Sequence, residues 1–300
     1  MSTPAIHIGP SDNEALAAAV RDGGGAPAPL DGADAVVWFG GAQDFPALPE
    51  SVRWVQLPAA GVETWMQRVR TAPEVTFTSA AGAFASDVAE HALALLLAGV
   101  RGLARYARAE RWEPADDRLL EGSTVAVVGA GGIGRALIDR LKPLDVEIVA
   151  VTRSGHDVPG ADRSLAAGRL DAVWASADHF VICAPATEAT RHLVGRDQLA
   201  AMRPHSWIVN IARGSLIDTE ALVEALQAER IGGAGLDVTD PEPLPDGHPL
   251  WASPRAIITP HVANPPSAQL RKLAERVREN VARFAAGERL IAPVEQERGY

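Results

Sequence analysis

Three polar side chains in the second half of the chain, Arg213, Glu242 and His261, each lie just beyond an apolar segment. A carbonyl that accepts a hydride also needs a proton, and histidine titrates in the range that lets it supply one. A neighbouring carboxylate would orient the imidazole and favour its charged form. An arginine fork matches a carboxylate in two parallel hydrogen bonds. These residue types therefore suit reduction of a carbonyl that stands next to a carboxylate.

Each of these residues also has a structural explanation when it is taken alone. Arg213 could be a solvated loop charge, Glu242 an exposed acid in a proline-rich turn, and His261 a core histidine with satisfied hydrogen bonds. Their shared position at consecutive strand ends favours the functional interpretation, because ligands of an open parallel sheet bind outside the carboxyl ends of its strands.

A glycine-rich loop precedes these residues in the chain. Gly129, Gly131 and Gly134 form a G-x-G-x-x-G pattern between an apolar run and a helical pattern. The first glycine permits a tight turn, the second lets a pyrophosphate approach the backbone, and the third allows close packing of helix on strand. Gly132 and Ile133 open the helix, whose free amides and dipole attract phosphates. A turn that only packs would explain Gly134 but not three glycines at this spacing, so we predict dinucleotide binding.

The elements that position these residues are short apolar runs that alternate with helical patterns. A first series of predicted strands covers 6–8, 35–39, 52–57 and 75–77, and a second covers 124–128, 146–151, 180–183, 207–211, 234–238 and 256–259. Near-continuous apolar strands are typical of parallel sheets that are covered on both faces. A helix predicted over 86–107 carries leucines around most of its circumference and should be buried between domains or against another subunit. Another helix follows Asn264, a plausible cap.

Length and pattern together indicate two domains of the α/β class. The net charge of −10 disfavours a nucleic-acid partner. The single cysteine, Cys183, is expected to be a buried strand residue in a reducing compartment. The N-terminus lacks a signal-peptide pattern, and the longest apolar stretch, 92–100, is too short to span a bilayer. We therefore expect a cytoplasmic protein with no membrane role.

The chain resembles the D-isomer-specific 2-hydroxyacid dehydrogenase family over nearly its whole length. The resemblance rests on the glycine loop and on the blocks 55–63, 89–94, 210–216 with Asp218, 236–245 and 259–263. The ending, from Val294 to Tyr300, resembles the glyoxylate/hydroxypyruvate reductase branch. The resemblance implies two Rossmann-like or flavodoxin-like parallel-sheet domains with the active-site cleft between them. It places the substrate-binding domain in 1–97 plus 268–300 and the dinucleotide-binding domain in 98–267.

The resemblance also implies a role for each matching residue. Arg213 would bind the substrate carboxylate and carbonyl, His261 would be the acid/base, and Glu242 would be its partner. Ala60 and Gly61 would offer backbone amides to the substrate. Asp237 would hold the nicotinamide carboxamide, and Pro185, Thr190 and Ile211 would line the cofactor cleft. No metal is implied. We assign His91, which lies in a matching block, to structure.

The sequence departs from the family pattern at the end of the second strand of the nucleotide domain. An acid normally hydrogen-bonds the ribose hydroxyls there and repels a 2′-phosphate, whereas this chain has Thr152, Arg153 and Ser154. The missing carboxylate and the added cation predict that NADP(H) is favoured over NAD(H). A solvated arginine at a strand end is the plain alternative. A second departure is Thr239, where an aromatic residue is common.

The predicted function is hydride transfer between NAD(P)H and a small 2-oxo or D-2-hydroxy acid, in a homodimer that uses the apolar helix over 86–107. The alternative from another class is a dinucleotide-sensing regulator, like the corepressors built on this scaffold, but no basic segment addresses DNA here. A different Rossmann enzyme would leave Arg213, Glu242 and His261 unexplained. The substrate side-chain pocket stays open, because Trp38, Phe39 and Trp65 could line it or pack in the core.

Overall fold

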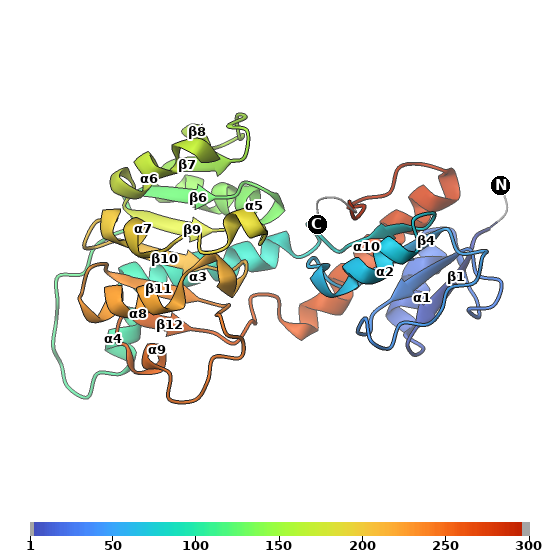
Figure 1. Ribbon diagram of the computed structural model, residues 1–300, viewed down its shortest axis with the longest axis horizontal. Helices are drawn as coiled ribbons and strands as arrows, with labels where there is room; N and C mark the ends of the chain where they lie inside the picture. Colours follow the sequence, from blue (N-terminus) through green and yellow to red (C-terminus); the bar gives the residue numbers. More distant parts are fainter. Residues whose placement is uncertain (1–2, 296–300) are drawn as a thin grey trace. The chain divides into compact units, whose positions relative to one another are not determined.

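Two parallel sheets organise the computed structural model, which describes residues 3–295 (Figure 1). One unit takes in the chain up to Phe84 and from Pro265 onward, and the other is Ala85–Asn264. The expected boundaries were 97/98 and 267/268. The first division falls earlier because helix α3 (Ala85–Val100) packs on elements of the second unit. Residues 296–300, which include most of the branch-like ending, lie outside the described part.

The first unit is a five-stranded sheet in the order β2-β1-β3-β4-β5, with every pairing parallel. Its strands are β1 (Ala5–Gly9), β2 (Ala26–Pro27), β3 (Ala35–Trp38), β4 (Trp54–Gln56) and β5 (Thr76–Thr78). Its helices are α1 (Glu14–Asp22), the 3-10 turn η1 (Glu63–Trp65), α2 (Met66–Thr71) and α10 (Pro266–Ala286). The four predicted strands are confirmed; the two-residue edge strand β2 was not predicted.

Alternating side chains of β4 explain how helices cover both faces of this sheet. Trp54 faces α10, where its ring lies 5.3 Å from that of Phe284. Val55 points to the opposite face and joins an apolar cluster with Met66 and Val69 of α2. The helix that returns from the far end of the chain is therefore part of the first unit's core.

The second unit is a seven-stranded parallel sheet in the order β12-β11-β10-β9-β6-β7-β8. The strands are β6 (Thr124–Val128), β7 (Glu147–Thr152), β8 (Arg163–Ala166), β9 (His179–Ile182), β10 (Trp207–Asn210), β11 (Gly233–Leu236) and β12 (Ala256–Ile258). The sequence order reverses between β6 and β9, which creates the crevice where doubly wound sheets bind ligands. The predicted fold class of two parallel-sheet α/β domains is confirmed.

Helices cover both faces of the larger sheet. α3 packs on α5 (Gly132–Leu141) and on strands β10 and β11, while α6 (Leu170–Ser176), α7 (Arg196–Ala201) and α8 (Thr219–Gln227) form a neighbouring series (Figure 1). The remaining short elements are α4 (Leu103–Ala107), α9 (Pro249–Ala252), η2 (Lys142–Leu144), η3 (Ala167–Arg169), η4 (Glu188–Thr190) and η5 (Gly214–Leu216). The sheet is thus buried on both sides, as its apolar strands indicated.

Two local expectations were wrong. The helix expected over 86–107 is interrupted, because Gly102 adopts a left-handed conformation with φ of 60° and separates α3 from α4. Asn264 does not cap the last helix. Pro265 occupies the N-cap position and Pro266 begins the helix, where its fixed φ suits the first turn.

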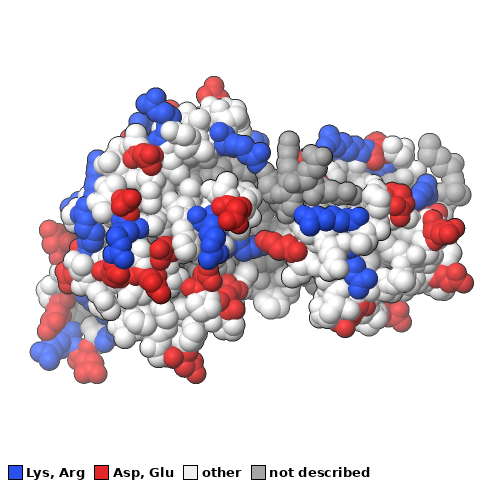
Figure 2. Space-filling view, viewed as in Figure 1, with Lys and Arg blue, Asp and Glu red and all other residues white. Residues whose placement is uncertain are grey.

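The surface carries both signs of charge. On the face shown in Figure 2, lysine and arginine side chains are interspersed with aspartate and glutamate, so that face presents no continuous basic surface. Within residues 3–295, no helix combines the length and the apolar character needed to cross a bilayer.

Candidate active site

Two positions of the glycine loop, Gly129 and Gly134, admit only glycine. Gly129 has a φ of 102°, and a Cβ atom there would lie 2.6 Å from the backbone nitrogen of Ala184. A Cβ at Gly134 would lie 2.2 Å from the carbonyl oxygen of Gly129. Gly131 instead faces open space, with no described atom within 4 Å of its Cβ position.

Gly131 is also the N-cap of α5, and within the described chain no side chain caps that helix. The first-turn amides, including those of Gly132 and Ile133, are therefore available to an anion, and the helix dipole favours negative charge there. Open space above Gly131 and an uncapped helix of ten residues fit the pyrophosphate of a dinucleotide.

The loop after β7 presents a cation and a hydroxyl. Thr152 is buried, and its Oγ1 accepts a hydrogen bond of 2.9 Å from the amide of Gly155, so its side chain shapes the turn. Arg153 and Ser154 are exposed. Ser154 Oγ lies 3.1 Å from Nδ1 of His156, an exposed residue that the sequence analysis did not include. The sequence did offer a signal for His156, because it is a second basic side chain three residues after Arg153.

The other predicted cofactor residues follow strands beside β6. After β9, the hydroxyl of Thr190 donates to the carbonyl of Pro185 at 2.7 Å and accepts from the amide of Thr187 at 2.8 Å, which closes a turn. Ile211 directly follows β10 and is buried. These positions share the carboxyl edge of the sheet with the glycine loop, because β10, β9 and β6 are parallel neighbours.

Cys183 lies just after β9 rather than inside it, and the residue is partly exposed. Its thiol is nevertheless enclosed, and burial raises the thiol pKa to about 12. Because the thiolate is the nucleophilic form, this side chain is unsuited to catalysis at neutral pH.

Arg213 is positioned by a buried amide at the end of β10. Asn210 donates through Nδ2 to the carbonyl of Arg213 at 2.8 Å, and its Oδ1 accepts from the amide of Ala212 at 3.1 Å. The next residue, Gly214, packs against the loop after β11, since a Cβ there would lie 1.9 Å from the carbonyl oxygen of Thr239. The loop that carries Arg213 therefore contacts the loop that carries Glu242.

Glu242 and His261 form the expected pair. Nδ1 of His261 lies 2.7 Å from Oε1 of Glu242, and the two side chains are 53% and 42% exposed. They line a cavity of about 320 Å³ together with Thr239, Trp251 and Thr259. A hydrogen-bonded acid and imidazole that open onto a cavity form an arrangement able to exchange a proton with a small molecule.

Asp237 lies beneath this pair and is almost fully buried. Its Oδ1 accepts from the hydroxyl of Thr259 at 2.6 Å and from the amide of Val262 at 2.9 Å, and its Oδ2 accepts from the amide of Ala263 at 3.0 Å. Burial alone would raise the pKa of Asp237, but these bonds and the contact with His91 bring it below its usual value. Contact with a nicotinamide carboxamide stays a prediction.

The predicted substrate amides lie in the first unit, in the loop after β4. Ala60 is exposed and Gly61 half-buried. Two of the aromatic residues considered for a side-chain pocket pack in the core instead: Trp38 and Trp65 each make an edge-on ring contact with Phe45, at 5.2 and 5.3 Å. Phe39 is half-buried.

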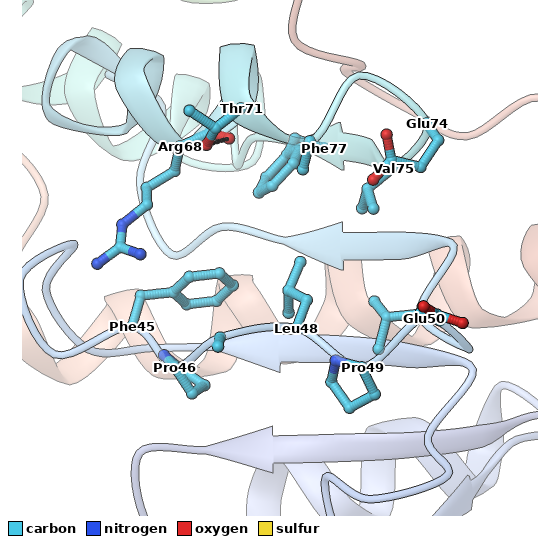
Figure 3. Close-up of a pocket in the computed structure, with 13 residues that line it drawn as sticks. Phe45, Pro46, Leu48, Pro49, Glu50, Arg68, Thr71, Glu74, Val75 and Phe77 are labelled. Atoms are coloured by element: carbon cyan, nitrogen blue, oxygen red, sulfur yellow. Dashed lines mark hydrogen bonds between the residues drawn. The ribbon is translucent and has the colours of Figure 1, made fainter.

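A separate cavity of about 380 Å³ in the first unit is lined mainly by apolar side chains, including Phe45, Leu48 and Phe77 (Figure 3). It contains none of the predicted site residues. Within residues 3–295, no cluster of three or more His, Cys, Asp or Glu side chains is arranged to hold a metal ion.

Comparison with known proteins identifies the family. Residues 92–263 match the NAD-binding domain of the D-isomer specific 2-hydroxyacid dehydrogenases. A Corynebacterium melassecola protein described as uncharacterized, from the region 3′ of proB, is 41% identical and covers 94% of this chain and 95% of its own. Glyoxylate reductase of Korarchaeum cryptofilum is 30% identical, over 82% of this chain and 77% of its own.

The fold has close counterparts among solved structures. A D-isomer specific 2-hydroxyacid dehydrogenase from Xanthobacter autotrophicus Py2, solved in complex with NADPH and MES, has a TM-score of 0.83 and is 25% identical, with 100% of both chains covered. Both units, including the helix that returns from the end of the chain, therefore belong to a known architecture.

Proposed function

This chain belongs to the D-isomer specific 2-hydroxyacid dehydrogenase family, an oxidoreductase family with a nicotinamide cofactor, and on that premise we propose that it reduces a small 2-oxo acid to the D-2-hydroxy acid. The observation that carries the proposal is the 2.7 Å hydrogen bond between Glu242 and His261, which both line a cavity. Glyoxylate and hydroxypyruvate are the first substrates to test, because the Korarchaeum relative is a glyoxylate reductase.

The proton is supplied by His261. An ionised Glu242 can only accept a hydrogen bond, so Nδ1 of His261 carries a proton and Nε2 is the nitrogen that exchanges one with the substrate. As the carbonyl carbon receives a hydride, Nε2 gives its proton to the carbonyl oxygen. The carboxylate of Glu242 stabilises the imidazolium until then. The reduced nicotinamide supplies the hydride when it is bound.

Substrate orientation is assigned to Arg213 and to the amides of Ala60 and Gly61. A guanidinium binds a carboxylate through two parallel hydrogen bonds and polarises the neighbouring carbonyl, which lysine cannot do in the same geometry. Asn210 holds the backbone of Arg213 in place for this task.

The test is a panel of 2-oxo acids against Arg213→Lys and wild type. Wild type should reduce glyoxylate, hydroxypyruvate or phenylpyruvate, and the variant should lose most of its kcat/KM for them. Simple ketones, which lack the carboxylate, should lose much less. Equal losses would place carboxylate recognition elsewhere. Dinucleotide binding without turnover of any 2-oxo acid would favour the sensor function instead.

We propose that NADPH is the preferred reductant. The end of β7 carries no acid, because Thr152, Arg153 and Ser154 stand there, and the exposed Arg153, Ser154 and His156 can all contact a 2′-phosphate. The experiment compares kcat/KM for NADPH and NADH in wild type and in a Thr152→Asp, Arg153→Ala double variant. Aspartate can still accept the Gly155 amide, so the turn should be retained. A wild type that already prefers NADH would contradict the proposal.

We propose that the protein is a homodimer whose interface includes α4 and the loop after it. Leu103, Tyr106 and Trp112 are 53%, 37% and 96% exposed in the single chain. Clustered exposed apolar side chains mark interaction surfaces. A Leu103→Ser, Trp112→Ser double variant should shift the sedimentation profile toward monomer, whereas Leu270→Ser, at another exposed leucine, should not. A monomeric wild type would refute the proposal.

A further inference from the structure

We propose that Asp237 and His91, linked through Thr259, are positioning residues that hold His261 in its working conformation. The inference rests on the proposed function, because it concerns the same acid/base residue. It assigns Asp237 a role besides any contact with the cofactor and gives His91, which carries out no step of the reaction, a reason for its position.

The first observation is that the segment 259–263 wraps around Asp237. The carbonyl oxygen of Asp237 accepts from the amide of His261 at 2.8 Å. Its carboxylate accepts from the next two amides, those of Val262 and Ala263, at 2.9 and 3.0 Å. One buried residue thus binds three consecutive amides, the first of which belongs to the acid/base residue itself.

The second observation is the backbone of His261. Its φ is 53°, in the left-handed region that a side chain with a Cβ rarely adopts. Such a conformation persists only where surrounding bonds impose it. The amide of His261 also lies 3.0 Å from the carbonyl of Thr259, so the residue is fixed between the backbone atoms of Asp237 and Thr259.

The third observation is the direction of the hydrogen bonds that reach α3. An ionised carboxylate accepts only, so the hydroxyl of Thr259 donates its single proton to Oδ1 of Asp237 at 2.6 Å. The hydroxyl must then accept from Nε2 of His91, 2.9 Å away. His91 therefore carries a proton on Nε2, which lies 3.4 Å from Oδ1 of Asp237.

This arrangement also explains how a carboxylate can be buried beneath the site. An unpaired buried charge is costly, and one that is fully hydrogen-bonded is tolerated. The Thr259 hydroxyl and two amides donate to Asp237, with the His91 ring beside it. Removing the charge weakens these side-chain bonds at once and loosens the residues on either side of His261, whose own amide still bonds to the backbone carbonyl of Asp237.

The test on Asp237 is the Asp237→Asn variant, with Asp246→Asn in an exposed nearby turn as the control. Amide hydrogen exchange at Val262 and Ala263 should quicken by at least about tenfold in Asp237→Asn. kcat should fall by about 10- to 100-fold, because small displacements of a reacting group are that costly. Affinity for NADPH, measured by fluorescence titration, should change much less than kcat. Thr259→Val removes one hydrogen-bond donor to Asp237 and should show smaller increases in amide exchange and a smaller loss of kcat. This variant tests the proposal if Asp237→Asn does not fold.

Two outcomes would overturn the assignment of Asp237. One is unchanged amide exchange at Val262 and Ala263. The other is a loss of NADPH affinity as large as the loss of kcat, which would make Asp237 a cofactor contact only. Neither outcome bears on whether wild type reduces 2-oxo acids, so the proposed function is tested separately.

The test on His91 uses conservative rescue. His91→Gln keeps an N–H donor for Thr259 and should retain most of the wild-type kcat, whereas His91→Leu should lower kcat by about 3- to 10-fold with faster exchange at Val262. Glu90→Gln, at the exposed neighbour on α3, is the control. Equal kcat for His91→Gln and His91→Leu would show that the hydrogen bond to Thr259 has no positioning role.

Discussion

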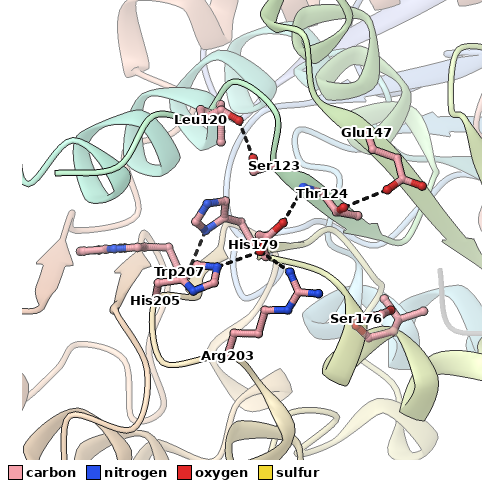
Figure 4. Close-up of polar contacts among 11 residues, drawn as sticks. Leu120, Ser123, Thr124, Glu147, Ser176, His179, Arg203, His205 and Trp207 are labelled. Carbon is pink, nitrogen blue, oxygen red and sulfur yellow. Dashed lines mark hydrogen bonds and ion pairs between the residues drawn. The ribbon is translucent and has the colours of Figure 1, made fainter.

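Two clusters of aspartate and histidine lie at opposite ends of the larger sheet. At the amino ends of β6, β9 and β10, Asp178 accepts from the amide of Thr124 and from the side chains of His205 and Arg203. Figure 4 labels these three partners. At the carboxyl ends of β11 and β12, the cluster consists of Asp237, Glu242 and His261. Aspartate and histidine occur in both clusters, and only the second is proposed to do chemistry.

Hydrogen bonding and exposure separate the two clusters. His179 in the first is 1% exposed, and its Nδ1 accepts from the amide of Trp207. Burial lowers the pKa of His179 to about 4, so it is neutral near pH 7. His261 instead has a 53% exposed ring beside a cavity. Residue types alone do not identify a site: the carboxyl end of the sheet, an open cavity and a charged partner do so together.

The largest contrast should come from removing one histidine at each end. His261→Ala should lower turnover of 2-oxo acids by about two to four orders of magnitude, because the proton donor is gone. His205→Ala should leave turnover essentially unchanged and lower the melting temperature. Steady-state rates and thermal unfolding of both variants measure the two effects. Near-normal turnover in a folded His261→Ala protein would remove the distinction between the clusters.

A smaller contrast is expected between the two acids. Glu242→Gln should lower kcat for reduction by about 10- to 100-fold, because a neutral amide still accepts from Nδ1 of His261 but no longer stabilises its positive charge. Asp178→Asn, the matched change at the other end, should retain kcat. If both variants kept full activity, the Glu242–His261 bond would have no catalytic part.

For stability, unlike for kcat, the change at Asp178 should have a larger effect than the change at Glu242. Asp178→Asn should lower the free energy of unfolding by about 1–3 kcal/mol, since it weakens bonds from Thr124, His205 and Arg203 to a side chain that is only 15% exposed. Glu242→Gln should change it by less than about 0.5 kcal/mol, because that side chain is 42% exposed. Denaturant unfolding of both proteins decides the order. A larger destabilisation by Glu242→Gln would contradict it.

The last contrast is in acid stability. Although burial would raise the pKa of Asp178, bonds from Thr124, His205 and Arg203 lower it from 3.8 to about 2, so its contribution is present above pH 3.8 and is lost as pH falls toward 2. His179, lowered from 6.5 to about 4, contributes above pH 6.5 and destabilises the fold as pH falls toward 4. When the unfolding free energy is plotted against pH, Asp178→Asn should reduce the slope between pH 3.8 and about 2. His179→Asn should reduce the slope between pH 6.5 and about 4. If the stability curves of both variants ran parallel to that of wild type, neither Asp178 nor His179 would contribute to the pH dependence of stability.

The sequence predicted the strands of both sheets well because parallel strands covered on two faces are continuous apolar runs, and parallel pairing brings their carboxyl ends together. β8 escaped prediction since its segment, beginning at Arg163, is a short edge strand that is only partly buried. The interruption at Gly102 was missed because the leucine pattern continues across it.

The site was predictable where the residue type itself indicates a chemical role, as for the pairing of the acid Glu242 with the imidazole of His261. The network around Asp237 was not, because His91 lies far away in the chain and only the packing of α3 brings it to Thr259. The left-handed backbone of His261 likewise depends on hydrogen bonds that no local pattern reveals.

The contact at Gly214 has a mechanical consequence. Its α-carbon lies so close to Thr239 that even a methyl group would collide with the carbonyl there, and the hydroxyl of Thr219 ties down the next carbonyl, that of Asp240, at 2.6 Å. We therefore expect the loops that carry Arg213 and Glu242 to shift together rather than independently. Under the proposed function, a carboxylate that draws Arg213 toward it would also shift Glu242, so that substrate binding and the alignment of His261 would be coupled.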